Sequence, residues 1–118
     1  MKIKQMSPQL LVTDLERSLA FYTSHLGFEI NFCYQDFYAG IRNEAYSIHL
    51  KLGKPVQSEE DEHLDLYFSV EAIGELFEDF RNRPVTIVQT LREMPYGKEF
   101  YIADPDGYIL GFIEEKKE

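Results

Sequence analysis

Cysteine is almost absent from this chain, and several catalytic motifs are absent altogether. Cys33 is the only cysteine, so no disulfide can form within the chain, and one thiol does not favour a thiolate metal site. The sequence contains no nucleophile elbow, P-loop, Cys-x-x-Cys or His-Glu-x-x-His pattern. The acidic run 59–62 lacks the glycine and the ligand alternation of a calcium loop.

Positive charge is also scarce. Twelve basic residues face 21 acidic residues, which gives a formal net charge of −9. This charge disfavours nucleic acids and anionic membrane surfaces, and it favours a cationic partner. No apolar run approaches the length of a membrane span, and residues 1–8 lack the apolar core of a signal peptide. We therefore expect a cytoplasmic protein.

The chain has enough apolar surface for an ordinary core. Its 118 residues are 44% apolar and include 17 Phe and Tyr, which suits one domain or two small halves that share a core. Residues 98–114 predict two strands around the turn Asp104-Pro-Asp-Gly107. Phe100 and Ile102 share one face of this hairpin, and that face needs a cover.

The first half predicts a strand, a helix and three further strands. Asp14 suits a helix N-cap, an apolar stripe runs from Leu15 to Leu26, and Gly27 suits the helix end. The strands are expected near residues 10–12, 28–34, 37–42 and 47–52. The polar, acidic stretch 55–63 predicts a linker between modules 1–54 and 64–118 of a single domain.

The second half repeats this order. A strand is expected at 64–70, a helix from Ile73 that ends before Pro84, a strand at 85–91, and a loop at 92–97 before the hairpin. Apolar positions of the first helix recur 58 residues later. The sequence therefore predicts an α+β fold of two βαβββ modules, which form a cupped and mostly antiparallel sheet with helices on one side.

Strand parity gathers polar and aromatic residues on the face of the sheets away from the helices. These are Ser7, Gln9, Ser47, His49, Lys51, Asp65, Tyr67, Glu99 and Tyr101. This face suits a ligand cleft, and equally the solvated side of an antiparallel sheet. His63 and Asp65 could join His49 as metal ligands, although the trio lacks a fourth partner.

Two segments carry a family resemblance. Residues 12–28 (Val12-Thr-Asp-Leu-Glu-Arg-Ser-Leu-Ala-Phe-Tyr-Thr-Ser-His-Leu-Gly-Phe28) and 104–114, with Tyr96-Gly97, resemble the glyoxalase/bleomycin resistance/dioxygenase superfamily, which has the vicinal oxygen chelate fold. The resemblance implies two βαβββ modules and a homodimer. It places the metal-ligand positions of metal-dependent members at Ser7, His49, Asp65 and Gly111. Only His49 and Asp65 are good ligands, and a catalytic metal needs about three.

The resemblance therefore favours the metal-free, bleomycin-resistance-like members, which sequester cationic, aromatic antibiotics in clefts lined by aromatic side chains. Tyr34 is a further candidate for stacking, and a negative potential favours a cationic guest. We expect binding of an aromatic or cationic small molecule without catalysis or cofactor, by His49, Asp65, Tyr67, Tyr38, Tyr96, Glu99 and Tyr101. The alternative is a lyase or dioxygenase that binds one divalent metal ion through His49 and Asp65.

Overall fold

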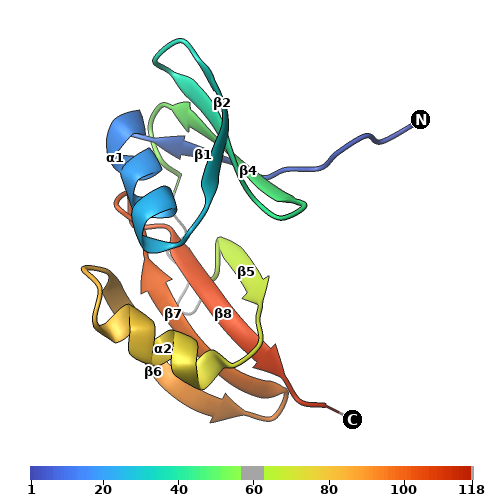
Figure 1. The fold of residues 1–118 in the computed structure, drawn as a ribbon, viewed down its shortest axis with the longest axis vertical. Coiled ribbons are helices and arrows are strands. Elements are labelled where there is room, and N and C mark those ends of the chain that lie inside the picture. Colours follow the sequence, from blue (N-terminus) through green and yellow to red (C-terminus); the bar gives the residue numbers. More distant parts are fainter. Residues whose placement is uncertain (57–62, 118) are drawn as a thin grey trace. The chain divides into compact units, whose positions relative to one another are not determined.

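The computed structural model describes residues 1–56 and 63–117. These residues form two compact units, Met1–Val56 and Gln57–Glu118, each with a four-stranded sheet and a helix (Figure 1). Residues 57–62 of the predicted linker lie outside the described residues, so the predicted module boundaries stay a prediction. No helix in the described part of the chain is long and apolar enough to cross a membrane.

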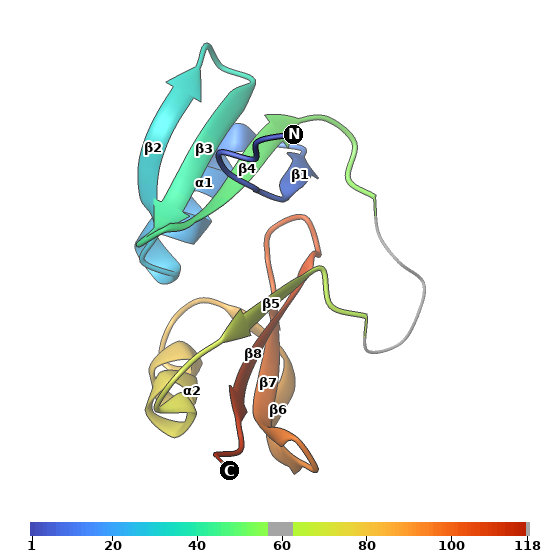
Figure 2. The same ribbon diagram turned by 90° about the vertical axis from the view of Figure 1, so that its right-hand side faces the viewer.

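The first unit places its first strand beside its last. Its sheet has the order β1-β4-β3-β2, in which β1 runs parallel to β4 and the other pairs are antiparallel. Figure 2 shows α1 against one face of this sheet. The elements are β1 (Gln9–Val12), α1 (Leu15–Ala20), the π-helical turn η1 (Phe21–His25), β2 (Glu29–Tyr34), β3 (Tyr38–Asn43) and β4 (Tyr46–Leu52).

The second unit repeats this topology. Its sheet has the order β5-β8-β7-β6, with β5 parallel to β8. The elements are β5 (Leu66–Ser69), α2 (Ile73–Arg81), β6 (Thr86–Met94), β7 (Gly97–Ala103) and β8 (Ile109–Glu115). The predicted α+β fold of two βαβββ modules with mostly antiparallel pairing is therefore confirmed.

Asp14 begins the first helix as predicted. Its Oδ1 accepts a hydrogen bond from the Arg17 backbone N–H at 3.0 Å, and Gly27 follows the helix with φ +79°. The last turn is π-helical rather than α-helical, and in it the Thr23 hydroxyl donates to the Leu19 carbonyl at 2.7 Å. Leu15 and Tyr22 are buried between this helix and the sheet.

Aromatic rings form the core of the second unit. Phe100 is fully buried, and its ring lies 5.1 Å from Phe112, 5.2 Å from Phe77 and 5.7 Å from Phe80, between centroids. Phe100 and Ile102 therefore face α2, as the hairpin pattern predicted. Glu99 and Tyr101 consequently lie on the face away from α2, which we call the helix-free face.

A side chain near the C-terminal end of β8 caps the start of α2. Ala72 occupies the N-cap position with φ +53° and has no side chain that can cap. The Glu114 carboxylate of β8 instead accepts hydrogen bonds from the Ala72 and Ile73 N–H groups at 3.3 and 3.2 Å. The next residue, Glu115, points to the other face and accepts hydrogen bonds from the Tyr67 and Ser69 hydroxyls.

The predicted loop 92–97 is wrong for four of its six residues, 92–94 and 97, which belong to strands. Strand β6 continues to Met94, and a tight turn at Pro95 and Tyr96 leads directly into β7. Arg92 and Glu99 are directly paired across the two strands and carry opposite charges. This ion pair stabilises the extension of β6.

Candidate functional site

On the helix-free face of the first unit, His49 lies at the centre of a polar and aromatic cluster. It pairs in register with Gln9 of β1 on one side and with Gly40 of β3 on the other. The His49 Nδ1 lies 2.8 Å from the Tyr38 hydroxyl, which accepts a hydrogen bond from Gln9 Nε2 at 3.0 Å. At the edge of this cluster, the Ser7 and Ser47 hydroxyls are hydrogen-bonded to each other.

The ring of Phe32 lies directly over Gly40. A Cβ atom on Gly40 would come within 2.1 Å of Phe32 Cε1, so the ring occupies the space that a side chain would fill. The ring is nearly parallel to Tyr38, with centroids 6.1 Å apart, and meets His49 edge-on at 5.4 Å. We call this space above Gly40, bordered by Tyr38 and His49, the ring site.

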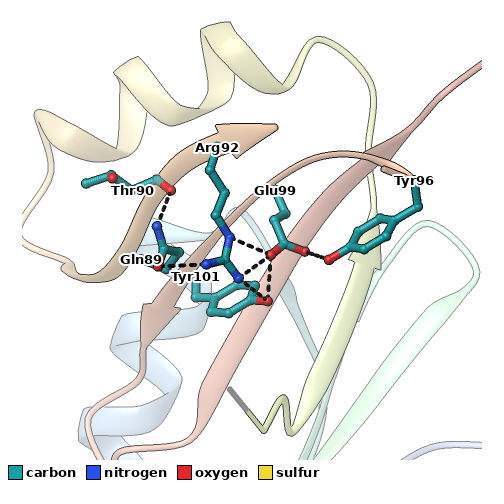
Figure 3. Close-up of polar contacts among 6 residues, drawn as sticks. All are labelled: Gln89, Thr90, Arg92, Tyr96, Glu99 and Tyr101. Atoms are coloured by element: carbon teal, nitrogen blue, oxygen red, sulfur yellow. Dashed lines mark hydrogen bonds and ion pairs between the residues drawn. The ribbon is translucent and has the colours of Figure 1, made fainter. Parts of the chain in front are cut away.

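On the helix-free face of the second unit, five side chains form one hydrogen-bonded network, in which Gln89 Oε1 accepts from Arg92 Nη1 at 3.2 Å (Figure 3). The Arg92 guanidinium donates to Glu99 Oε2 through Nε at 2.9 Å and Nη2 at 2.6 Å. The Tyr101 hydroxyl donates to the same oxygen at 2.8 Å, and the Tyr96 hydroxyl donates to Oε1. Arg92 also lies over the Tyr101 ring, 5.5 Å from its centroid. The network therefore compensates the charge of Glu99, whose side chain is only 1% exposed.

The network controls the protonation of its members. Burial raises the pKa of the Glu99 carboxyl, but the hydrogen bonds from Tyr96, Tyr101 and Arg92 outweigh burial, so the pKa is lowered. The hydrogen bond to Glu99 raises the pKa of Tyr96 to about 12. Glu99 is thus an anion at neutral pH, and Tyr96 remains a hydrogen-bond donor to it.

Tyr96 gives a testable alkaline transition. Because its pKa is about 12 in the folded protein and the ordinary value for tyrosine is 10.0, the unfolded chain releases this proton first. The stability due to Tyr96 is therefore complete below pH 10 and falls as the pH rises towards 12. Urea unfolding over this range should show a smaller loss in Tyr96→Phe than in the wild-type protein. An equal loss in both proteins would contradict the assignment.

The other predicted site residues of the second unit are engaged in local contacts. Tyr67 donates to Glu115, and this hydrogen bond raises the pKa of Tyr67 and lowers that of Glu115. Asp65 Oδ2 accepts from the Ile109 N–H at 2.8 Å, and its Oδ1 lies 3.2 Å from His63 Nε2. The hydrogen bonds of Asp65 and Tyr67 are therefore separate from those of the Glu99 network.

The donor set does not fit a catalytic metal. Residues 1–56 and 63–117 contain no group of three or more His, Cys, Asp or Glu side chains that could hold an ion. Both Asp65 oxygens and the His49 Nδ1 already have hydrogen-bond partners.

Sequence reasoning missed Phe32 and Arg92. A register shift between Ile30 and Phe32 in β2 pairs Phe32 with Gly40, and simple alternation along the strand does not predict this pairing. Arg92 falls in the predicted loop because Pro95 and Gly97 suggest an earlier break. Arg92 precedes Glu99 by seven residues, and the two lie on either side of a tight turn. This spacing was the signal in the sequence that could have predicted the ion pair.

Comparison with known proteins places the fold. A family model described as Glyoxalase/Bleomycin resistance protein/Dioxygenase superfamily matches residues 2–112. No curated protein sequence matches the chain.

Three similar solved structures share 18% of their residues with this chain. TnmS3, an antibiotic binding protein from Streptomyces sp. CB03234, is 18% identical with a TM-score of 0.76 and covers 98% of this chain and 99% of its own. TioX from Micromonospora sp. ML1 is 18% identical with a TM-score of 0.77, covering 97% and 100%. The fosfomycin resistance protein FosX from Listeria monocytogenes, solved with Mn(II), is 18% identical with a TM-score of 0.77, covering 98% and 93%.

These likenesses show the fold, and the family model spans nearly all of the sequence. The repeated βαβββ topology agrees with both. The chain belongs to the glyoxalase/bleomycin resistance protein/dioxygenase superfamily.

Proposed function

We propose that this protein binds and sequesters a small aromatic compound without chemically changing it. The ring site of the first unit is the observation that carries the proposal. A flat ring already fits there, because the backbone of Gly40 lies beneath it and Tyr38 and His49 border it. In the guest-free protein that ring is the protein's own Phe32.

Phe32 can leave this position at low cost. Its side chain is 38% exposed and belongs to β2, an edge strand whose residues are all exposed. Its ring packs against the rings of Tyr38 and His49, and aromatic pairs of this kind contribute about 0.5–1.5 kcal/mol each. A guest ring can restore the same contacts, so the exchange is close to balanced before the rest of the guest contributes.

The acidic side chains of the candidate site contribute less to binding a cationic guest than the net charge of the chain suggests. Glu99 is paired with Arg92, and Asp65 accepts hydrogen bonds from a backbone N–H and lies beside His63, so both carboxylates already have partners within the protein. The formal net charge of −9 still favours a positively charged aromatic guest over an anionic one. The proposal includes a homodimer in the cytoplasm, with exposed apolar side chains on β2, Ile30 and Tyr34 among them, available for association.

Two variants test the ring site in opposite directions. Gly40→Val fills the site permanently and should weaken binding by about fivefold or more, because overpacking costs about 1–3 kcal/mol. Phe32→Ala empties it and should leave affinity unchanged or increased, since no side chain has to be displaced. Thermal shift and calorimetry with a panel of polycyclic aromatics, fluorene among them, give the readout.

The controls separate binding from folding and from catalysis. Tyr46→Ser replaces a tyrosine that is 76% exposed and lies outside the ring site, so this variant should bind as the wild-type protein does. Mass spectrometry should recover each bound compound unchanged. Failure of every panel compound to stabilise the wild-type protein, or undiminished binding by Gly40→Val, would overturn the proposal.

The alternative is a metal-dependent lyase or dioxygenase that uses His49 and Asp65. The Mn(II) in the Listeria relative and the close approach of His63 to Asp65 are the observations in its favour. Elemental analysis of purified protein decides between the two. One divalent ion per chain, lost in His49→Ala, would replace sequestration with metal-dependent chemistry.

A further inference from the structure

One polar atom in the ring site has no partner. The His49 Nε2 is buried and makes no hydrogen bond to any described residue. A buried polar atom without a partner costs about 1–3 kcal/mol, so its presence in a folded protein calls for an explanation. The hydrogen bonds on the other side of the imidazole identify what Nε2 can bind.

The Tyr38 hydroxyl decides which imidazole nitrogen carries the proton. Its oxygen accepts from Gln9 Nε2, so that contact uses no hydroxyl proton. Among the described residues, the only remaining partner for the hydroxyl proton is His49 Nδ1, at 2.8 Å. Nδ1 therefore accepts, and the proton of the neutral imidazole is on Nε2.

We infer that His49 donates a hydrogen bond from Nε2 to an oxygen of the guest, and that the guest is an aromatic ring bearing a carbonyl oxygen. This inference rests on the proposed function, because it assigns the guest class of the same ring site. The ring of Phe32 packs at right angles against the imidazole, with the centroids 5.4 Å apart, and we expect Nε2 to become accessible when Phe32 turns outward. A guest ring that replaces Phe32 over Gly40 brings its oxygen next to Nε2.

The same protonation state opposes a metal at this position. A metal ligand needs the Nε2 lone pair, which requires the proton to move to Nδ1. The Tyr38 hydroxyl would then lose its acceptor, because its oxygen would have to accept from both His49 and Gln9. His49 is therefore set to donate to an organic oxygen.

The first test needs no ligand. Two-bond proton–nitrogen NMR spectra of ¹⁵N-labelled protein at about pH 8.5, above the ordinary imidazole pKa of about 6.5, report the tautomer of each histidine. His49 should be in the Nε2–H form in the wild-type protein, and in a mixture of forms in Tyr38→Phe. Tyr34→Phe, which removes a hydroxyl that does not contact His49, should not change the spectrum. An Nδ1–H form in the wild-type protein would overturn the inference.

The second test uses two probes that differ by one carbonyl. Fluorenone should bind about fivefold more tightly than fluorene, since one hydrogen bond contributes about 1 kcal/mol. The preference should disappear in His49→Phe and persist in His25→Phe. A preference that survives His49→Phe, or equal binding of both probes to the wild-type protein, would overturn the inference while leaving the ring site intact. If neither probe binds the wild-type protein, the proposed function fails, and the tautomer measurement still decides the protonation of His49.

Discussion

Replacing Arg92 with methionine should destabilise the protein by about 3 kcal/mol. The substitution leaves Glu99 with a side chain that is 1% exposed and without the cation that compensates its charge. We expect burial then to outweigh the hydrogen bonds that remain from Tyr96 and Tyr101. Urea unfolding at neutral pH measures the loss.

The pH dependence of stability should reverse in this variant. In the wild-type protein the Glu99 pKa is lowered, so its contribution is present above the unfolded pKa of 4.5 and is lost as the pH falls through the folded pKa. In Arg92→Met we expect the Glu99 pKa to be raised, so lowering the pH should restore stability. An unchanged pH profile would contradict this role for Arg92.

Two further variants identify the buried charge as the cause. Arg92→Met with Glu99→Gln removes both charges and should recover about 2 kcal/mol relative to Arg92→Met alone. Arg81→Met breaks an ion pair with Glu78 in which both side chains are more than half exposed, and it should cost less than about 1 kcal/mol. A comparable loss in Arg81→Met would show that the effect is unrelated to burial.

Gly97→Ala should destabilise the second unit by about 3 kcal/mol. Gly97 has φ +149°, and a Cβ there would lie 2.2 Å from the backbone oxygen of Glu114. Backbone atoms of a central strand cannot move aside as an exposed side chain can, so strain and overpacking both contribute. Denaturant unfolding measures the loss, and amide exchange should locate the disturbance at the turn between β6 and β7.

The same substitution elsewhere provides the matched control. Gly74 lies in the first turn of α2, where a Cβ atom would have nothing within 4 Å of it. Gly74→Ala should therefore stabilise the protein by about 0.5–1 kcal/mol through helix propensity. Similar losses in both variants would show that steric contact at Gly97 is not the cause.

The fold was largely predictable because apolar spacing and turn residues act locally. Asp14, Gly27 and the Asp104–Gly107 turn each specify a boundary through their own backbone chemistry. Strand parity also predicted which residues lie on the helix-free faces. His49 and Glu99 lie on the other side of their sheets from their buried sequence neighbours Ile48 and Phe100.

The neighbours of Phe32 and Arg92 could not be predicted from the alternation of side chains along a strand. A shift of register in β2 moves Phe32 over Gly40, and only the paired strands reveal it. The Arg92 pairing depends on how far β6 continues, which the turn residues Pro95 and Gly97 obscured. Local sequence specifies which residues can be on a face, whereas the identity of neighbours across strands is set by the folded sheet.

The two consecutive glutamates that end β8 have a consequence for the integrity of the chain. Glu114 holds the start of α2, and Glu115 holds the hydroxyls of β5 on the opposite side of the sheet. A protease that trims the tail as far as residue 113 would remove the cap of α2 and the side-chain hydrogen bonds to β5 together, while the backbone ladder between β5 and β8 remains. Glu114 and Glu115 thus connect β8 to elements on both faces of the second unit, although neither belongs to its aromatic core.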